Sequence, residues 1–157
     1  MCWNKHWRKF VTATVVCASF ASSAEAQAQH LPTTVDLWAT YCIAVLQYQL
    51  TLFESMPPDT PPEIQHGIAE EKERATSNLL RLRLYLMPRV PDLDPVSLAF
   101  ALDSGDKDAP EAIQAASQCV ESCANNRDGS TCLQRCTQAS KVMERVGICS
   151  NISWLPL

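Results

Sequence analysis

Four cysteines in the last third of the chain are arranged as two Cys-x3-Cys pairs, Cys119/Cys123 and Cys132/Cys136, with eight residues between the pairs. Cysteines four residues apart lie on one face of a helix, about 6 Å apart along its axis. Two helices joined by so short a connection must run antiparallel. The two cysteines next to the connection, Cys123 and Cys132, then face each other, and so do the two that lie one turn further away, Cys119 and Cys136. The spacing therefore predicts a helical hairpin held by the nested disulfides Cys123–Cys132 and Cys119–Cys136.

The side chains next to the cysteine pairs are small, which fits this hairpin. A disulfide requires Cα atoms about 4.4–6.8 Å apart, closer than the usual spacing of about 8–10 Å between helix axes. Ala115 and Ala116 stand before the first pair, and Ala139 and Ser140 stand after the second. We expect these four residues to face each other in the layer below the disulfides.

Apolar residues at helical spacing predict an all-α fold of four to five helices, and no segment alternates as a strand would. The acidic segment 103–108 is interpreted as a solvated loop, because it lacks the ligand spacing of a calcium-binding loop. Residues 29–157 are expected to form a single domain. The helices are expected over 35–55, 61–86, 94–105 with Gly105 as the end, 108–124, and 130–146.

Residues 1–28 have the layout of a cleavable signal peptide. The basic start contains Lys5, Arg8 and Lys9. It is followed by an uncharged run over 10–21, too short to span a bilayer, which takes about 20 residues, and then by small residues at alternate positions. We expect cleavage after Ala26 or Ala28, location in the periplasm or outside the cell with a bacterial signal, and no stable membrane insertion afterwards.

Cysteine usage agrees with export. Of the eight cysteines, Cys2 and Cys17 lie in the predicted signal, and an even number remains. An even number in an oxidising compartment favours a disulfide framework. Once the hairpin has used four, Cys42 and Cys149 are left for each other, and their bond would tie the first helix to the end of the chain.

The twin Cys-x3-Cys motif over 119–136 resembles the disulfide-stapled helical hairpins of the small chaperones of the mitochondrial intermembrane space and of plant α-hairpinin peptides. The resemblance covers these residues alone and implies only the disulfide geometry. Those groups include chaperones, protease inhibitors and antimicrobial peptides, so the motif is specific for the staple and not for a function.

The same four cysteines leave a metal site open as the competing interpretation. A spacing of three, eight and three residues suits a four-thiolate site for zinc or copper. Export and the even number of cysteines favour disulfides, and the nearest candidate histidines, His30 and His66, are distant in sequence. We therefore expect neither a metal nor another cofactor.

Signatures of catalysis are missing from the sequence. It has no Gly-x-Ser-x-Gly elbow, no His-Glu-x-x-His motif, no phosphate-binding glycine loop and no Cys-x-x-Cys redox pair. Removal of 1–26 takes away three cations and one anion, so the net charge changes from −4 to about −6. An acidic exported chain without a basic run is a poor partner for nucleic acid. We expect a protein that is not an enzyme.

The predicted helix over 35–55 supplies the candidate contact surface for a protein partner. It has no charged residue between Asp36 and Glu54. It also contains four aromatic residues, a type of residue that protein interfaces favour. Burial of these aromatic residues in the core is the alternative. The sequence thus predicts an exported, non-enzymatic protein-binding or structural protein, with a metal-binding protein or a periplasmic chaperone as alternatives. The candidate contact residues are Trp38, Tyr41, Tyr48 and Phe53.

Overall fold

The computed structural model describes residues 30–124 and 128–156, so the predicted signal peptide lies outside the described residues. Within these ranges the chain forms five α-helices and two 3-10 turns, which confirms the all-α fold. The helices are α1 (Thr34–Glu54), α2 (Pro62–Leu86), α3 (Pro95–Cys123), α4 (Gly129–Ala139) and α5 (Lys141–Gly147), and the turns are η1 (Val90–Asp92) and η2 (Ile148–Ser150).

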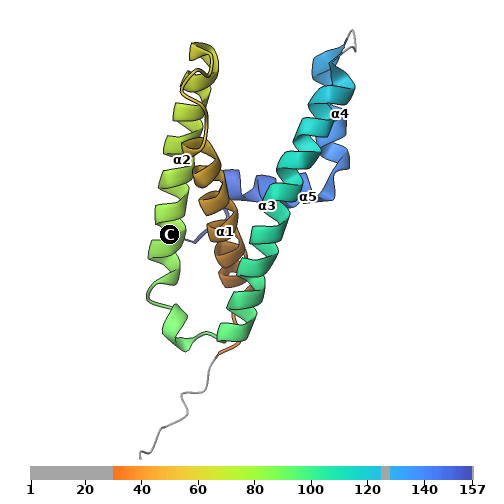
Figure 1. Cartoon of the computed structure of the whole chain (residues 1–157). Coiled ribbons are helices and arrows are strands. Elements are labelled where there is room, and N and C mark those ends of the chain that lie inside the picture. The colour runs from red at the N-terminus through yellow and green to blue at the C-terminus, as the bar shows by residue number, and fades with distance from the viewer. Residues whose placement is uncertain (1–29, 125–127, 157) are drawn as a thin grey trace, which may run out of the picture.

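Most of the apolar core lies between α1 and its neighbours. Figure 1 shows α1 between α2 and α3, and α5 crossing behind them with η2. Leu46 of α1 and Leu82 of α2 are almost completely buried, and Leu155 of the C-terminal tail packs into the same cluster. We call α1, α2, α3 up to Ala112, α5, η2 and the tail the body of the molecule.

A buried carboxylate joins the start of α1 to the end of α2. Asp36 is fully buried and forms a capping box with Thr33, whose backbone N–H donates to Oδ2 over 2.8 Å. Arg89 Nε donates to Oδ1 over 2.7 Å, and the Tyr85 hydroxyl donates to the same oxygen over 3.1 Å. Burial alone would raise the pKa of Asp36, but the hydrogen bonds from Arg89 and Thr33 outweigh it and hold this pKa well below its usual value.

The third helix is longer than the sequence predicts. The predicted helix end at Gly105, the loop over 103–108 and the new helix at Asp108 are wrong, because one helix runs without interruption through Gly105 and Pro110. A Cβ atom at position 105 would lie 2.5 Å from the carbonyl oxygen of Tyr41 and 2.9 Å from the Cβ of Ala44. Gly105 therefore marks the point where α3 crosses α1 closely, and not a helix end.

The predicted helix over 130–146 is interrupted. It divides into α4 and α5 at Ser140, whose backbone is extended at φ −93° and ψ 109°. The Ser140 hydroxyl oxygen caps α5 by accepting a hydrogen bond from the backbone N–H of Met143 over 3.5 Å. Ser140 is thus a helix breaker and cap, and the chain turns there from the hairpin back into the body.

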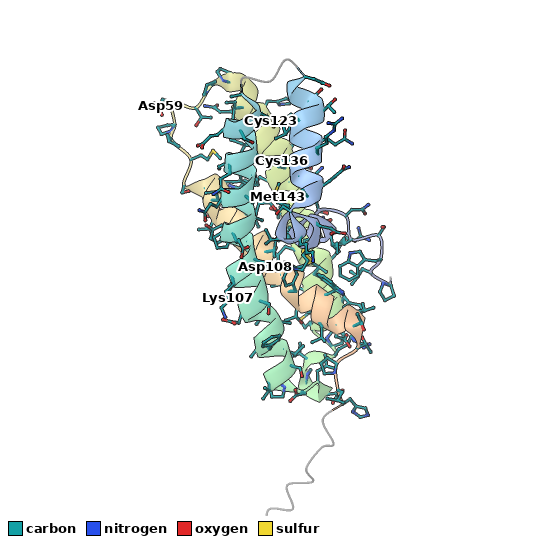
Figure 2. All side chains as sticks on the ribbon, turned by 90° about the vertical axis from the view of Figure 1, so that its right-hand side faces the viewer. Asp59, Lys107, Asp108, Cys123, Cys136 and Met143 are labelled. Carbon is teal, nitrogen blue, oxygen red and sulfur yellow. A yellow bond between two sulfur atoms is a disulfide. The ribbon has the colours of Figure 1, made fainter. Side chains whose placement is uncertain are left out.

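The hairpin itself is as predicted. The bonds Cys119–Cys136 and Cys123–Cys132 join α3 to α4 with Cα atoms 5.7 and 5.8 Å apart. Figure 2 shows the two helices side by side, with Cys123 closer to the tip than Cys136. We call this part, residues 115–123 of α3 together with α4, the arm. No residue of α4 is buried, so the arm has almost no apolar core of its own.

The third predicted disulfide is also present, between Cys42 and Cys149, with Cα atoms 5.1 Å apart. Both cysteines are almost completely buried, and the bond attaches η2 to the middle of α1. It therefore belongs to the core of the body and not to the arm.

Candidate functional site

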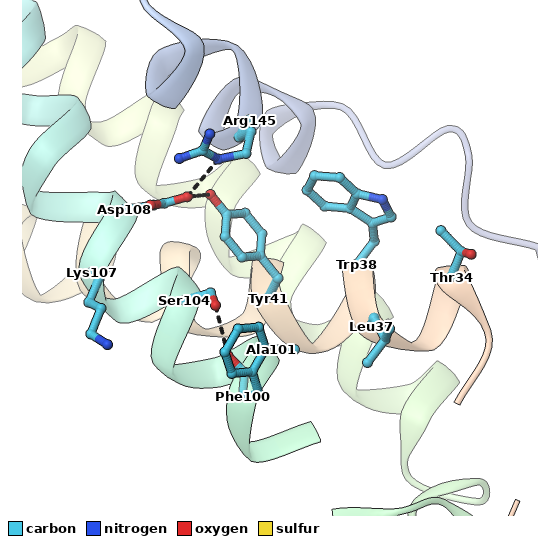
Figure 3. Close-up of a pocket in the computed structure, with 10 residues that line it drawn as sticks. All are labelled: Thr34, Leu37, Trp38, Tyr41, Phe100, Ala101, Ser104, Lys107, Asp108 and Arg145. Carbon is cyan, nitrogen blue, oxygen red and sulfur yellow. Dashed lines mark hydrogen bonds and ion pairs between the residues drawn. The ribbon is translucent and has the colours of Figure 1, made fainter. Parts of the chain in front are cut away.

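Two open grooves flank the crossing of α1 and α3, and they divide the four predicted contact residues between them. The Trp38 groove is about 560 Å³ in volume and is lined by Trp38 and Tyr41 of α1, Phe100 and Asp108 of α3, and Arg145 of α5, with five further residues shown in Figure 3. The fork groove is about 300 Å³ in volume and is lined by Tyr48 and Phe53 of α1, Ile113 of α3, and Met143 and Val146 of α5, together with eight further residues of α1, α3, α5 and η2.

The wall of the Trp38 groove is aromatic. The Trp38 ring is partly buried and meets the Tyr41 ring edge to face, with the two centroids 5.3 Å apart and the planes at 84°. Across the groove, Phe100 exposes 73% of its surface. So exposed a phenylalanine beside a partly buried tryptophan gives an apolar surface that a partner side chain could cover.

One end of the Trp38 groove is polar. The Tyr41 hydroxyl donates to Oδ2 of Asp108 over 2.9 Å, and Arg145 Nε donates to the same oxygen over 2.8 Å. These contacts, drawn as dashed lines in Figure 3, join α1, α3 and α5. Lys107 lies on the rim, where its ammonium group pairs with Asp103 over 2.6 Å.

The pKa values in this cluster move away from neutrality. Burial raises the pKa of Tyr41, and the neighbouring Asp108 carboxylate raises it further. The hydrogen bond from Arg145 lowers the pKa of Asp108 against the opposing effect of burial. At neutral pH the phenol is therefore a donor and the carboxylate an acceptor, whereas acid–base catalysis is most effective with a pKa close to the working pH. The arrangement suits holding three helices together and orienting the groove.

The predicted contact residues differ in what they offer to a partner. Tyr41 is only 6% exposed and belongs to the core, so it shapes the end of the groove. Trp38 and Phe53 are partly buried, while Tyr48 is exposed at the fork groove. Because α3 crosses α1 at Tyr41 and Ala44, the four residues do not form one surface.

Of the residues that line the Trp38 groove, only Trp38 and Tyr41 are contact residues that the sequence predicts. The missed residues that give the groove its character are Phe100, Asp108 and Arg145. For Phe100 a signal existed in the sequence, since Val96 and Phe100 are four residues apart and fall on a helix face other than that of Leu98 and Ala101. In the structure both Val96 and Phe100 are strongly exposed. For Asp108 and Arg145 no local signal existed, because 37 residues separate the two partners.

All four hairpin cysteines are consumed by disulfides, which leaves no thiolate there for a metal. Among the residues that the structure describes, no group of three or more His, Cys, Asp or Glu side chains is placed to hold a metal ion. In the same part of the chain, no helix has the length and apolar character needed to cross a membrane.

Comparison with protein-family models, with curated proteins and with solved structures gives no significant match. The likeness to other proteins stays at the level of the disulfide-stapled hairpin motif.

Proposed function

We propose that this protein is exported and, without acting as an enzyme, binds another protein through the Trp38 groove. Export is supported by the three disulfides, since such bonds form and persist mainly in oxidising compartments outside the cytosol. The predicted signal peptide over residues 1–28 also supports export.

The observation that carries the binding proposal is the exposure of Phe100 in an open groove whose other wall is Trp38. Aromatic residues supply much of the binding energy at protein interfaces, particularly where neighbouring contacts exclude water from them. Here an apolar partner side chain would be enclosed between the two rings, and the Arg145 guanidinium at the polar end would orient a carboxylate or carbonyl of the partner.

A photoreactive amino acid at position 100 tests the binding proposal in cells that produce the protein. Val120 provides the matched control position, because it is 57% exposed but lies on the arm, away from the groove. We expect one discrete cross-linked product from position 100 and none from position 120. Products from both positions, or from neither, would contradict binding at this groove.

With the captured partner purified, Phe100→Ala should weaken binding about tenfold or more, which is the size expected of an interface hot spot. The thermal midpoint should stay within the error of the wild type, because Phe100 makes no contribution to the buried core cluster. Val120→Ala should leave the affinity unchanged.

Export has a separate test, which is cell fractionation followed by N-terminal sequencing. We expect the protein outside the cytosol, with Gln27 or Gln29 as its first residue. Recovery from the cytosol with an intact N-terminus would contradict export, whatever the outcome at the groove.

A periplasmic chaperone is the second candidate, and two adjacent open apolar grooves favour it. A chaperone would bind many unfolded chains and would suppress the aggregation of a reduced model protein. Suppression lost in both Phe100→Ala and Tyr48→Ala would support it, whereas a single specific partner sensitive only to Phe100→Ala would favour the first proposal.

A further inference from the structure

The outer face of α2 carries an apolar stripe that the body does not cover. Leu79, Leu82 and Leu86 of this helix are buried toward α1. On the opposite face, Leu80, Leu84 and Met87, the C-cap residue of the helix, are 58, 56 and 67% exposed. Figure 1 shows α2 at the edge of the molecule, with α1 between it and α3. We call Leu80, Leu84 and Met87 the Leu80 stripe.

The spacing of the Leu80 stripe is that of a helix–helix contact. Intervals of four and three residues are those of the d and a positions of a heptad, the positions by which one helix packs along another. The stripe is narrow and contains no aromatic residue, whereas helices that lie in a membrane interface present a broad apolar face with tryptophan, phenylalanine and leucine. The pattern favours a partner helix over a lipid surface.

The charges around the stripe specify the kind of helix. Between Glu73 and Asp92 the chain has four arginines and no acidic residue, although the whole protein is acidic. Arg81 and Arg83 follow Leu80 and precede Leu84, which places them at the e and g positions beside the stripe. Among the described side chains neither forms an ion pair, whereas Arg74 pairs with Glu71 and Arg89 with Asp36.

We infer that the Leu80 stripe docks an amphipathic helix of a partner protein that carries acidic residues on both sides of its own apolar seam. The apolar seam would cover Leu80, Leu84 and Met87, and the flanking carboxylates would meet Arg81 and Arg83. A second copy of this chain fits poorly, because pairing two identical stripes would bring the arginine flanks together without compensating carboxylates.

This inference adds a second surface to the proposed function and does not depend on the first. The stripe lies on the side of α2 away from α1, while the Trp38 groove is built from α1, α3 and α5. Substitutions in one surface therefore leave the other intact, and the two proposals can fail separately.

Two designed helical peptides of about four heptads test the inference against the oxidised, isotope-labelled protein. Both carry leucine at a and d; one carries glutamate at e and g, and the other lysine. We expect the glutamate peptide to bind at least tenfold more tightly, with NMR shifts centred on residues 80–87, and this preference to weaken as salt is raised.

Three variants sharpen the test. Leu84→Ser should abolish binding of the glutamate peptide, whereas Val120→Ser, at a position of almost equal exposure on the arm, should leave it unchanged. The charge reversal Arg81→Glu with Arg83→Glu should transfer the preference to the lysine peptide. Phe100→Ala should have no effect on either peptide.

Several outcomes would overturn the inference. Equal binding of the two peptides, no binding, or shifts centred on Phe100 would show that the stripe and its arginines do not select an acidic helix. Concentration-dependent dimerisation lost in Leu84→Ser would assign the stripe to a second copy. Binding to phosphatidylglycerol vesicles without binding of the glutamate peptide would assign it to a lipid surface.

Discussion

In the body, Leu46 and Leu82 from neighbouring helices are almost completely buried, whereas α4 in the arm buries no residue. The body has a continuous apolar core to which α1, α2, η2 and the tail contribute. The arm has two disulfides spaced one helical turn apart instead. One chain therefore contains a region held by burial and a region held by covalent bonds.

The difference shows what apolar burial and disulfide bonds each contribute to stability. Full burial of a leucine contributes about 1.5–3 kcal/mol, and a core of many such residues can order several helices at once. A pair of short helices cannot bury enough apolar surface by itself, and disulfides replace the missing core, as they do in other very small domains. The Cys42–Cys149 bond is different, because it adds a covalent tie to a region that already has a core.

The largest effect is expected from removing that tie. Cys42→Ala with Cys149→Ala opens a loop of 107 residues, and chain-entropy models assign such a closure about 4–5 kcal/mol. Urea unfolding of the body should show a loss of this size. A loss no larger than that caused by removing an arm disulfide would contradict the assignment of this bond to the core.

Gly105→Ala comes next, with an expected loss of about 1–3 kcal/mol from overpacking. The new Cβ would meet the backbone oxygen of Tyr41, which cannot rotate away as a flexible side chain could. Gly67→Ala is the control, because nothing lies within 4 Å of its Cβ position in α2. It should raise stability by up to about 1 kcal/mol through helix propensity. In thermal melts, Gly105→Ala should therefore lower the midpoint temperature and Gly67→Ala should raise it.

Asp36→Asn should cost about 1–2 kcal/mol at neutral pH, because it weakens the contacts with Arg89, Tyr85 and Thr33. The folded pKa of Asp36 is lowered, so its contribution is complete above the unfolded pKa of about 3.9 and is lost as the pH falls below that value. The difference between wild type and variant, measured by urea unfolding, should therefore shrink as the pH is lowered below about 3.9. A constant difference would show that the charge of Asp36 contributes nothing.

The smallest effect on the body is expected from the arm. Replacement of the four arm cysteines by serine should remove the hydrogen-exchange protection of α4 amides. The unfolding free energy of the body should change by less than about 0.5 kcal/mol, because α5 stays anchored by buried Val142 and by the ion pair of Arg145 with Asp108. Continued protection of α4, or loss of the body together with it, would show that the two regions are not separate.

The parts of the fold that could be predicted from sequence are those fixed by local geometry. Cysteine spacing determined the pairing in the arm, and once those four were used, Cys42 and Cys149 remained. The continuous helix around Gly105 could not be predicted, because acidic residues and a glycine usually indicate a loop. Here the glycine is needed inside the helix, where α3 crosses α1 closely. The interruption of the predicted helix over 130–146 at Ser140 could not be predicted for a related reason. It lies where the chain turns to pack α5 against α3 and η2, and that contact is not visible in the local sequence.

The candidate site was predictable only in part. The aromatic residues of α1 were found from composition, but their division into two grooves depends on where α3 crosses, and no local pattern contains that information. Phe100 lies in the predicted helix over 94–105, for which the sequence predicts no contact residue. The contact of Asp108 with Tyr41 and Arg145 joins three distant parts of the chain, so it becomes visible only when the fold is known.

The 29 residues of α3 extend from the body into the arm, a length of about 43 Å at 1.5 Å per residue. The arm is thus the far end of a helix that is held in the body where Gly105 packs against Tyr41 and Ala44 of α1. A force on the arm would therefore be transmitted along α3 to its contact with Tyr41. The two disulfides would keep the C-terminal end of α3 helical, where a helix without a partner would fray.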